Sequence, residues 1–170
     1  KPDSQDVCFI PPGGYQEFLR ARVASIPGEM VDSAGRVLGR HPGLEFFTVG
    51  QRRGLGLTGE KPIFVTRLEP ETRRVVVGPE EDLFAPGLRA KEVKWTRGRP
   101  PTGVMPVQAK IRYQAPEAPA TLVAADGGDA FLWFQEPQRA VTPGQAVVFY
   151  VGEEVLGGGF IDQPVYEPMS

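Results

Sequence analysis

Glycine and proline interrupt this chain at short intervals, with 21 Gly and 18 Pro among 170 residues and no fixed period. Both residue types favour turns and disfavour helix interiors, so the apolar segments between them suit short strands better than long helices. The hydrophobic content of 41% and the charged content of 24% are typical of a folded globular protein. We therefore expect a mainly β protein, long enough for one ordinary domain or two small ones, with two favoured.

Six strand-like runs follow residue 87 at short spacing. Turn signals separate them, among them the Gly127–Gly128 pair and the Pro143, Gly144, Gln145 turn. The runs are LRAKEVKWT, MPVQAKIRYQ, PATLVAAD, DAFLWFQEP, QAVVFYVG and EVLGGGFI. Six short strands of this kind predict a small closed β-barrel over residues 88–168.

Residues 11–78 predict a small mixed α+β central domain. YQEFLRARV has apolar residues near helical spacing, whereas GEMVDSAGRVLG and IFVTRLEPETRRVVVG each resemble a hairpin. Between the hairpins, HPGLEFFTVGQRRGLGLTG begins with a possible helical turn and ends in a Gly-rich basic loop. The acidic segment 79–87, with prolines near both ends, is the predicted linker, and residues 1–10 form a separate segment around Cys8.

Charge is unevenly distributed although the net charge is only -2. Residues 88–114 carry seven basic groups and one acid, whereas residues 115–170 carry eight acids and one Arg. Strand alternation in VQAKIRY places Val107, Ala109, Ile111 and Tyr113 on one face, and Gln108, Lys110 and Arg112 on the opposite, outward face. The stretch is either a basic patch for an anionic partner or an ordinary solvated strand face.

Cys8 is the only cysteine, so no disulfide can form within the chain and a cytoplasmic setting is favoured. Its apolar neighbours in VCFI suit a buried strand, and the nearby acids Asp3 and Asp6 do not favour a thiolate. With a single histidine, His41, the chain lacks the ligands of a structural zinc site, and no metal is expected. No apolar run is long enough to span a membrane, so no membrane partner is expected.

Five segments together resemble the tRNA-specific 2-thiouridylases. They are KPDSQDVCFI, HPGLEFFTVGQRRGLG, VQAKIRY, AVTPGQAVVFY and LGGGFI, in this order and at these separations. The resemblance spans nearly the whole chain but matches only the C-terminal half of that family. The family's ATP-pyrophosphatase domain, with its SGGxDS loop and a first catalytic cysteine, has no counterpart here. Because the chain also begins with Lys, we expect it to be a fragment of a longer enzyme.

The resemblance implies a sulfurtransferase that thiolates position 2 of the wobble uridine in the tRNAs for Lys, Glu and Gln. ATP, with Mg, would activate the base in the missing domain, so this fragment needs no cofactor of its own and is expected to be inactive alone. Cys8 would carry a persulfide supplied by a sulfur-donor protein, such as a cysteine desulfurase or a sulfur relay protein. The family's barrel is similar to those of translation factors.

The family's site residues are carried onto this chain one by one. Ser4, Gln5 and Asp6 would orient the Cys8 segment, and Arg112, Tyr113 and Gln145 would contact tRNA. Arg52 and Arg53 are further candidates for phosphate contacts. Since neighbouring strand residues face opposite ways, Arg112 and Tyr113 can both reach RNA only at a strand end or bulge.

Two other functions remain open from the sequence. One is a non-catalytic RNA-binding β-barrel, for which the basic stretch would suffice. The other is an unrelated thiol enzyme that pairs Cys8 with His41.

Overall fold

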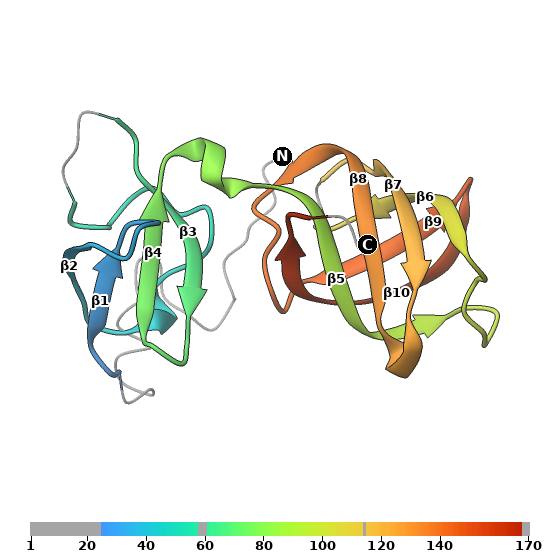
Figure 1. Ribbon diagram of the computed structural model, residues 1–170, viewed down its shortest axis with the longest axis horizontal. Helices are drawn as coiled ribbons and strands as arrows, with labels where there is room; N and C mark the ends of the chain where they lie inside the picture. The colour runs from blue at the N-terminus through green and yellow to red at the C-terminus, as the bar shows by residue number, and fades with distance from the viewer. Residues whose placement is uncertain (1–24, 58–60, 114, 168–170) are drawn as a thin grey trace, which may run out of the picture. The chain divides into compact units, whose positions relative to one another are not determined.

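The computed structural model describes residues 25–57, 61–113 and 115–167. The chain divides into two compact units, Lys1–Glu80 and Glu81–Ser170, called here the first unit and the barrel unit. Strands dominate both units, and the described helices are three short 3₁₀ turns (Figure 1). None of the helices in the described ranges has the length and the hydropathy needed to cross a bilayer.

The first unit is built on a four-stranded mixed sheet. Its strands are β1 (Gly28–Val31), β2 (Val37–His41), β3 (Phe64–Glu69) and β4 (Arg74–Gly78), in the order β2-β1-β4-β3. Both predicted hairpins are present as antiparallel pairs, and the two hairpins join through a parallel pairing of β1 with β4. The helix predicted from YQEFLRARV lies outside the described residues.

One face of this sheet is covered by the segment that connects β2 to β3. The segment contains the 3₁₀ helix η1 (Leu44–Phe46), where a helical turn is predicted. Its apolar side chains pack on the sheet to form a core of Met30, Phe46, Phe47, Leu55, Val65, Val75 and Val77. Burial of these side chains is the main force that holds the connecting segment, with its Gly-rich end, against the sheet.

The barrel unit is a closed six-stranded antiparallel barrel, as predicted. Its strands are β5 (Phe84–Trp95), β6 (Val104–Lys110), β7 (Ala118–Ala124), β8 (Ala130–Arg139), β9 (Ala146–Val151) and β10 (Glu154–Val165). They follow the order β10-β5-β8-β7-β6-β9 around the barrel. Alternate residues face the interior, where Leu88, Leu122, Leu132, Phe149 and Ile161 are fully buried.

Three successive glycines in β10 allow the barrel to close. A Cβ atom added at Gly157 would lie 2.6 Å from the carbonyl oxygen of Lys94, and one at Gly159 would lie 2.6 Å from that of Lys91, both on β5. A Cβ atom at Gly158 would lie 2.7 Å from the carbonyl oxygen of Val147 on β9. Only glycine permits β10 to approach both neighbouring strands this closely.

The segment predicted as a linker, 79–87, contains the boundary between the two units, but it is structured. It contains the 3₁₀ helix η2 (Glu80–Leu83) and the first residues of β5. Phe84 pairs with Arg139 of β8, and the Ala140 N–H donates a hydrogen bond of 2.8 Å to the Leu83 carbonyl. These partners are distant in sequence, so the local proline and glycine content did not reveal the strand.

Candidate functional site

Arg112 and Tyr113 lie in the turn that follows β6. The strand ends at Lys110, and the inward alternation that buries Val107, Ala109 and Ile111 stops at Ile111. Tyr113, predicted to share that inward face, is instead 89% exposed. The prediction for Tyr113 is wrong because it extended strand geometry past the last paired residue. A turn, unlike a strand, leaves Arg112 and Tyr113 exposed together.

The Arg112 side chain is anchored to a second turn. Its Nη2 donates a hydrogen bond of 2.7 Å to the backbone carbonyl of Arg139, at the end of β8. The Arg112 carbonyl in turn accepts a 3.2 Å hydrogen bond from the Ala115 N–H. The exposed guanidinium is therefore held at a defined place, which lowers the entropy cost of binding an anion there.

Gln145 closes a tight turn between β8 and β9. Its N–H bonds the Thr142 carbonyl at 3.3 Å, and Gly144 adopts φ 84°, which explains the proline–glycine pair at the centre of this turn. The Gly144 N–H also donates a hydrogen bond of 2.8 Å to the Ile161 carbonyl of β10, and the Ile161 N–H donates one of 2.8 Å to the Gln145 carbonyl. The backbone of Gln145 is thus fixed, while its side-chain Oε1 is buried without a hydrogen-bond partner among the described residues.

These three residues gather at one end of the barrel. Lys110 pairs with Val148, so the chain leaves β6 beside the first residues of β9. Gln145 immediately precedes β9, and Arg112 is bonded to the segment that leads into the same turn. We call this the Arg112 end of the barrel, defined by Lys110, Arg112, Tyr113, Arg139 and Gln145.

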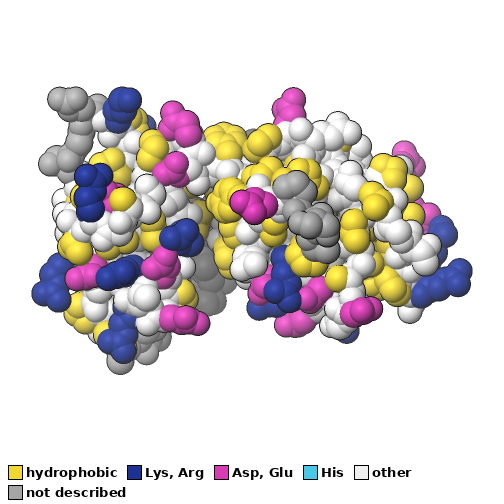
Figure 2. All heavy atoms as spheres, viewed as in Figure 1, with side chains coloured by type: hydrophobic (Ala, Val, Ile, Leu, Met, Phe, Trp, Pro, Cys, Tyr) yellow, Lys and Arg dark blue, Asp and Glu magenta, His cyan; other side chains and the backbone are white. Residues whose placement is uncertain are grey.

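The basic stretch 88–114 does not form one continuous positive surface. Arg89 bonds Asp129 at 2.6 Å, Lys91 lies 3.4 Å from Asp162, and Arg97 lies 3.0 Å from Glu154. Asp129 raises the pKa of Arg89 by hydrogen bonding and by its charge. The acids that follow residue 114 thus neutralise part of the stretch, and Figure 2 shows basic and acidic side chains side by side on the visible barrel face.

The cations of the stretch also lie at different places on the barrel. Arg97 and Arg99 belong to the connection from β5 to β6, whereas Arg112 follows the far end of β6. A seven-residue strand separates the two ends by about 20 Å. The expectation of a single surface from Arg89 to Arg112 is therefore corrected to a smaller set, Lys110 and Arg112, at the Arg112 end.

Arg52 and Arg53 lie in an exposed loop of the first unit, between η1 and β3. The Gln51 side chain holds this loop, because its Oε1 accepts the Thr48 N–H at 3.1 Å and its Nε2 donates to the Arg53 carbonyl at 2.9 Å. The Gln51 carbonyl also accepts the Val65 N–H at 2.9 Å. Neither arginine forms an ion pair with another residue of the described ranges, so both are free to bind an anion.

His41 is a packing residue. Only 3% of its surface is exposed, its Nε2 lies 3.1 Å from the Arg73 carbonyl, and its ring meets that of Phe47 edge-on at 5.4 Å. Cys8, Ser4, Gln5 and Asp6 lie outside the described residues, as does any contact that they make. The chemistry assigned to them remains a prediction.

Two family models match this chain, and they divide it as the structure does. Residues 16–79 match the tRNA methyl transferase PRC-barrel domain, and residues 85–161 match the aminomethyltransferase beta-barrel domain. The chain is 49% identical over 164 residues to the tRNA-specific 2-thiouridylase MnmA of Moorella thermoacetica, which covers 95% of this chain and 46% of that protein. It is 46% identical over 169 residues to the protein of the same name from Geobacter metallireducens, covering 98% and 46%.

The chain belongs to the tRNA-specific 2-thiouridylase family. It spans less than half the length of these relatives. Both units of the structure lie within the matched region.

Sequence reasoning missed one contact in this 2-thiouridylase chain, the Arg112 bond to the Arg139 carbonyl. The two residues are 27 positions apart, and the acceptor is a backbone atom, so no residue type marks the contact. Only the predicted barrel could have suggested this contact, because a closed barrel that contains β6 and β8 brings the ends of the two strands together.

Proposed function

We propose that this chain is the sulfur-carrying and tRNA-holding part of a tRNA 2-thiouridylase. The observation that carries the proposal is sequence similarity. Over 95% of its length, the chain is 49% identical to a protein named for this activity. The substrates would be the tRNAs for Lys, Glu and Gln, thiolated at C2 of the wobble uridine. A sulfur-donor protein, a cysteine desulfurase or a sulfur relay protein, would load Cys8.

In the proposed reaction, Cys8 delivers the terminal sulfur of its persulfide to the uridine base. The uridine O2 would first be adenylated outside the two units described here, at the expense of ATP and with release of pyrophosphate. The terminal sulfur of the Cys8 persulfide attacks C2, the C2–O bond breaks and AMP leaves, so that the base is joined to Cys8 through a disulfide. A thiolate from a second cysteine of the full-length enzyme then attacks the Cys8 Sγ, which releases 2-thiouridine and leaves a Cys–Cys disulfide for later reduction. Exclusion of water protects the activated base during these steps.

The Arg112 end of the barrel and the Arg52 loop are the proposed tRNA contacts. Arg112, Arg52 and Arg53 offer exposed guanidinium groups to phosphates, Tyr113 offers an exposed ring for stacking, and Gln145 offers an amide. Arg112 is anchored by its bond to the Arg139 carbonyl, the Arg52 loop by the Gln51 side chain, and Gln145 by the backbone bonds of its turn. These residues would bind the tRNA without taking part in the covalent steps. Their role would be to hold the substrate in place while Cys8 reacts.

The test is the substitution Cys8→Ser in the full-length enzyme. We expect loss of thiolation with adenylation of tRNA retained, because the substitution removes the sulfur carrier and leaves the ATP site intact. Nucleoside analysis of tRNA from cells that carry only the variant measures the first quantity, and AMP transfer to tRNA measures the second. Persistent 2-thiouridine in the variant would contradict the carrier role and favour a non-catalytic RNA-binding barrel.

A further inference from the structure

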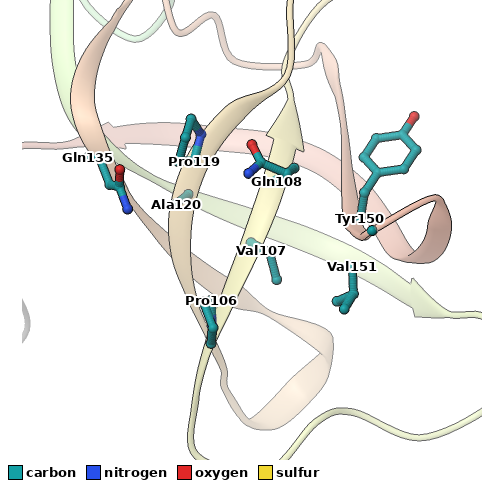
Figure 3. Close-up of a pocket in the computed structure, with 9 residues that line it drawn as sticks. Pro106, Val107, Gln108, Pro119, Ala120, Gln135, Tyr150 and Val151 are labelled. Carbon is teal, nitrogen blue, oxygen red and sulfur yellow. The ribbon is translucent and has the colours of Figure 1, made fainter.

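A shallow groove of about 190 Å³ crosses the outer surface of the barrel over β9, β6, β7 and β8 (Figure 3). Gln108 of β6 pairs with Tyr150 of β9 on one side and with Pro119 of β7 on the other. Gln135 of β8 follows one position beyond the Ala120–Phe134 pair. Figure 3 shows Gln135, Pro119, Gln108 and Tyr150 in this order across the four strands.

The chemistry of the groove excludes an anion as its ligand. Each of the nine described residues that line it is uncharged, so a phosphate or carboxylate would find no counterion inside. The groove instead offers one aromatic ring, from Tyr150, and two side-chain amides, from Gln108 and Gln135. A flat ring for stacking beside amides that donate and accept hydrogen bonds is the combination with which proteins hold an unstacked nucleobase.

The groove is continuous with the Arg112 end of the barrel. Outward positions alternate along β6, so the residue after Gln108 on the outer face is Lys110, about 7 Å along the strand. Arg112 follows in the adjoining turn. An RNA strand with phosphates on Lys110 and Arg112 would therefore place a neighbouring base within reach of Gln108 and Tyr150.

We propose that this groove binds one unstacked nucleobase of the tRNA substrate, stacked on Tyr150 and hydrogen-bonded along its edge by Gln108 on the neighbouring strand. The proposal rests on the proposed function and extends its tRNA surface by a site that recognises a base instead of the backbone. The site would favour an unpaired nucleotide, because a base within a duplex cannot enter the groove.

The test compares two RNAs binding to the full-length protein: a tRNA transcript and a fully paired RNA duplex without unpaired bases. Tyr150→Ala and Gln108→Ala should each lower the affinity for tRNA, by about tenfold for the tyrosine. Neither should change the affinity for the duplex or the salt dependence of tRNA binding, because no ionic contact is removed. Tyr150→Phe, which keeps the ring, should bind tRNA nearly as wild type does, and thermal melting confirms that each variant is folded.

The outcomes separate this proposal from the one on which it rests. If the wild-type protein binds no tRNA, the proposed function itself fails. If Arg112→Ala weakens tRNA binding while Tyr150→Ala and Gln108→Ala do not, the function stands and the groove assignment is overturned. Unchanged RNA affinity together with slower thiolation in the Tyr150→Ala enzyme would likewise overturn it and point to a protein partner at the groove.

Discussion

The Arg112 guanidinium and the Arg139 carbonyl, joined by a hydrogen bond of 2.7 Å, connect the turn after β6 to the end of β8. The bond uses one of the five N–H donors of the guanidinium, and the Arg112 side chain is exposed. The remaining donors are therefore presented on a side chain whose direction is already set. This arrangement suits a bidentate contact with phosphate.

Replacement of Arg112 by Ala in the full-length protein should weaken tRNA binding and flatten its dependence on salt. Each lost phosphate contact lowers the slope of log affinity against log salt concentration by roughly 0.7 to 0.9. Titrations of tRNA at several salt concentrations give both quantities. Arg112→Lys should restore much of the slope, because it keeps the charge.

Arg97→Ala is the matched control for Arg112→Ala. Arg97 is also an exposed arginine of the barrel, but it lies beside Glu154 at the opposite end. We expect its loss to leave affinity and slope near the wild-type values. Equal behaviour of the two alanine variants would show that Arg112 is an ordinary surface residue.

The double substitution Arg52→Gln with Arg53→Gln should lower the salt slope by about twice the single-contact value. Stability should change little, because the bonds that hold the loop come from Gln51 and from backbone atoms. Filter binding at several salt concentrations checks the slope and thermal melting checks the fold. Wild-type affinity in the double variant would remove this loop from the proposed tRNA surface.

Gly28→Ala should destabilise the first unit by about 3 kcal/mol, the upper part of the usual range for overpacking. A Cβ atom there would clash with the Arg73 carbonyl oxygen and would lie 2.7 Å from His41 Nε2. Gly39→Ala is the control on the partner strand, since its Cβ would meet only the flexible Leu57 Cδ2, at 3.3 Å. Denaturant unfolding should separate the two variants clearly, and similar losses would show that the backbone at Gly28 can shift.

Acid should destabilise the first unit through Asp32 and Glu69. Hydrogen bonds from the Arg36 backbone and side chain lower the pKa of Asp32, and the Thr72 hydroxyl and the Arg67 guanidinium lower the pKa of Glu69. A carboxyl whose pKa is lower in the folded state stabilises that state above its unfolded pKa of about 4, and this contribution is lost as the pH falls through the folded pKa.

The melting temperature of the first unit should therefore fall as the pH is lowered from about 5 to about 3. The variant carrying Asp32→Asn and Glu69→Gln should start with a lower melting temperature at neutral pH and show a weaker dependence over the same range. Parallel curves for variant and wild type would assign the acid sensitivity to other groups.

Local patterns in the sequence were sufficient to predict the strands. Alternation in VQAKIRY correctly places Val107, Ala109 and Ile111 in the core, because a strand's period of two is a local property. The Pro143–Gly144 pair likewise marks a tight turn, in which Gly144 adopts φ 84°. These features depend only on neighbours in the chain.

Features that depend on distant partners were not predicted. The end of β6 at Lys110 exposes Tyr113, and the pairing of Phe84 with Arg139 extends β5 into the segment expected to be a linker. The basic stretch seemed continuous because its acidic partners, Asp129, Asp162 and Glu154, come later in the sequence. Among the site residues, Tyr113 and Gln145 could be proposed only from the family resemblance, whereas strand alternation also placed Arg112 on the outward, basic face.

The glycine-rich β10 is the last strand of the barrel and pairs with both β5 and β9. During synthesis, β5 to β9 can assemble only an open sheet, whose two edge strands stay unpaired until β10 has left the ribosome. The barrel unit can therefore complete its fold only after β10 has been translated. A nascent chain that stalls before Glu154 would expose both edges at once and would be a target for chaperones or for aggregation.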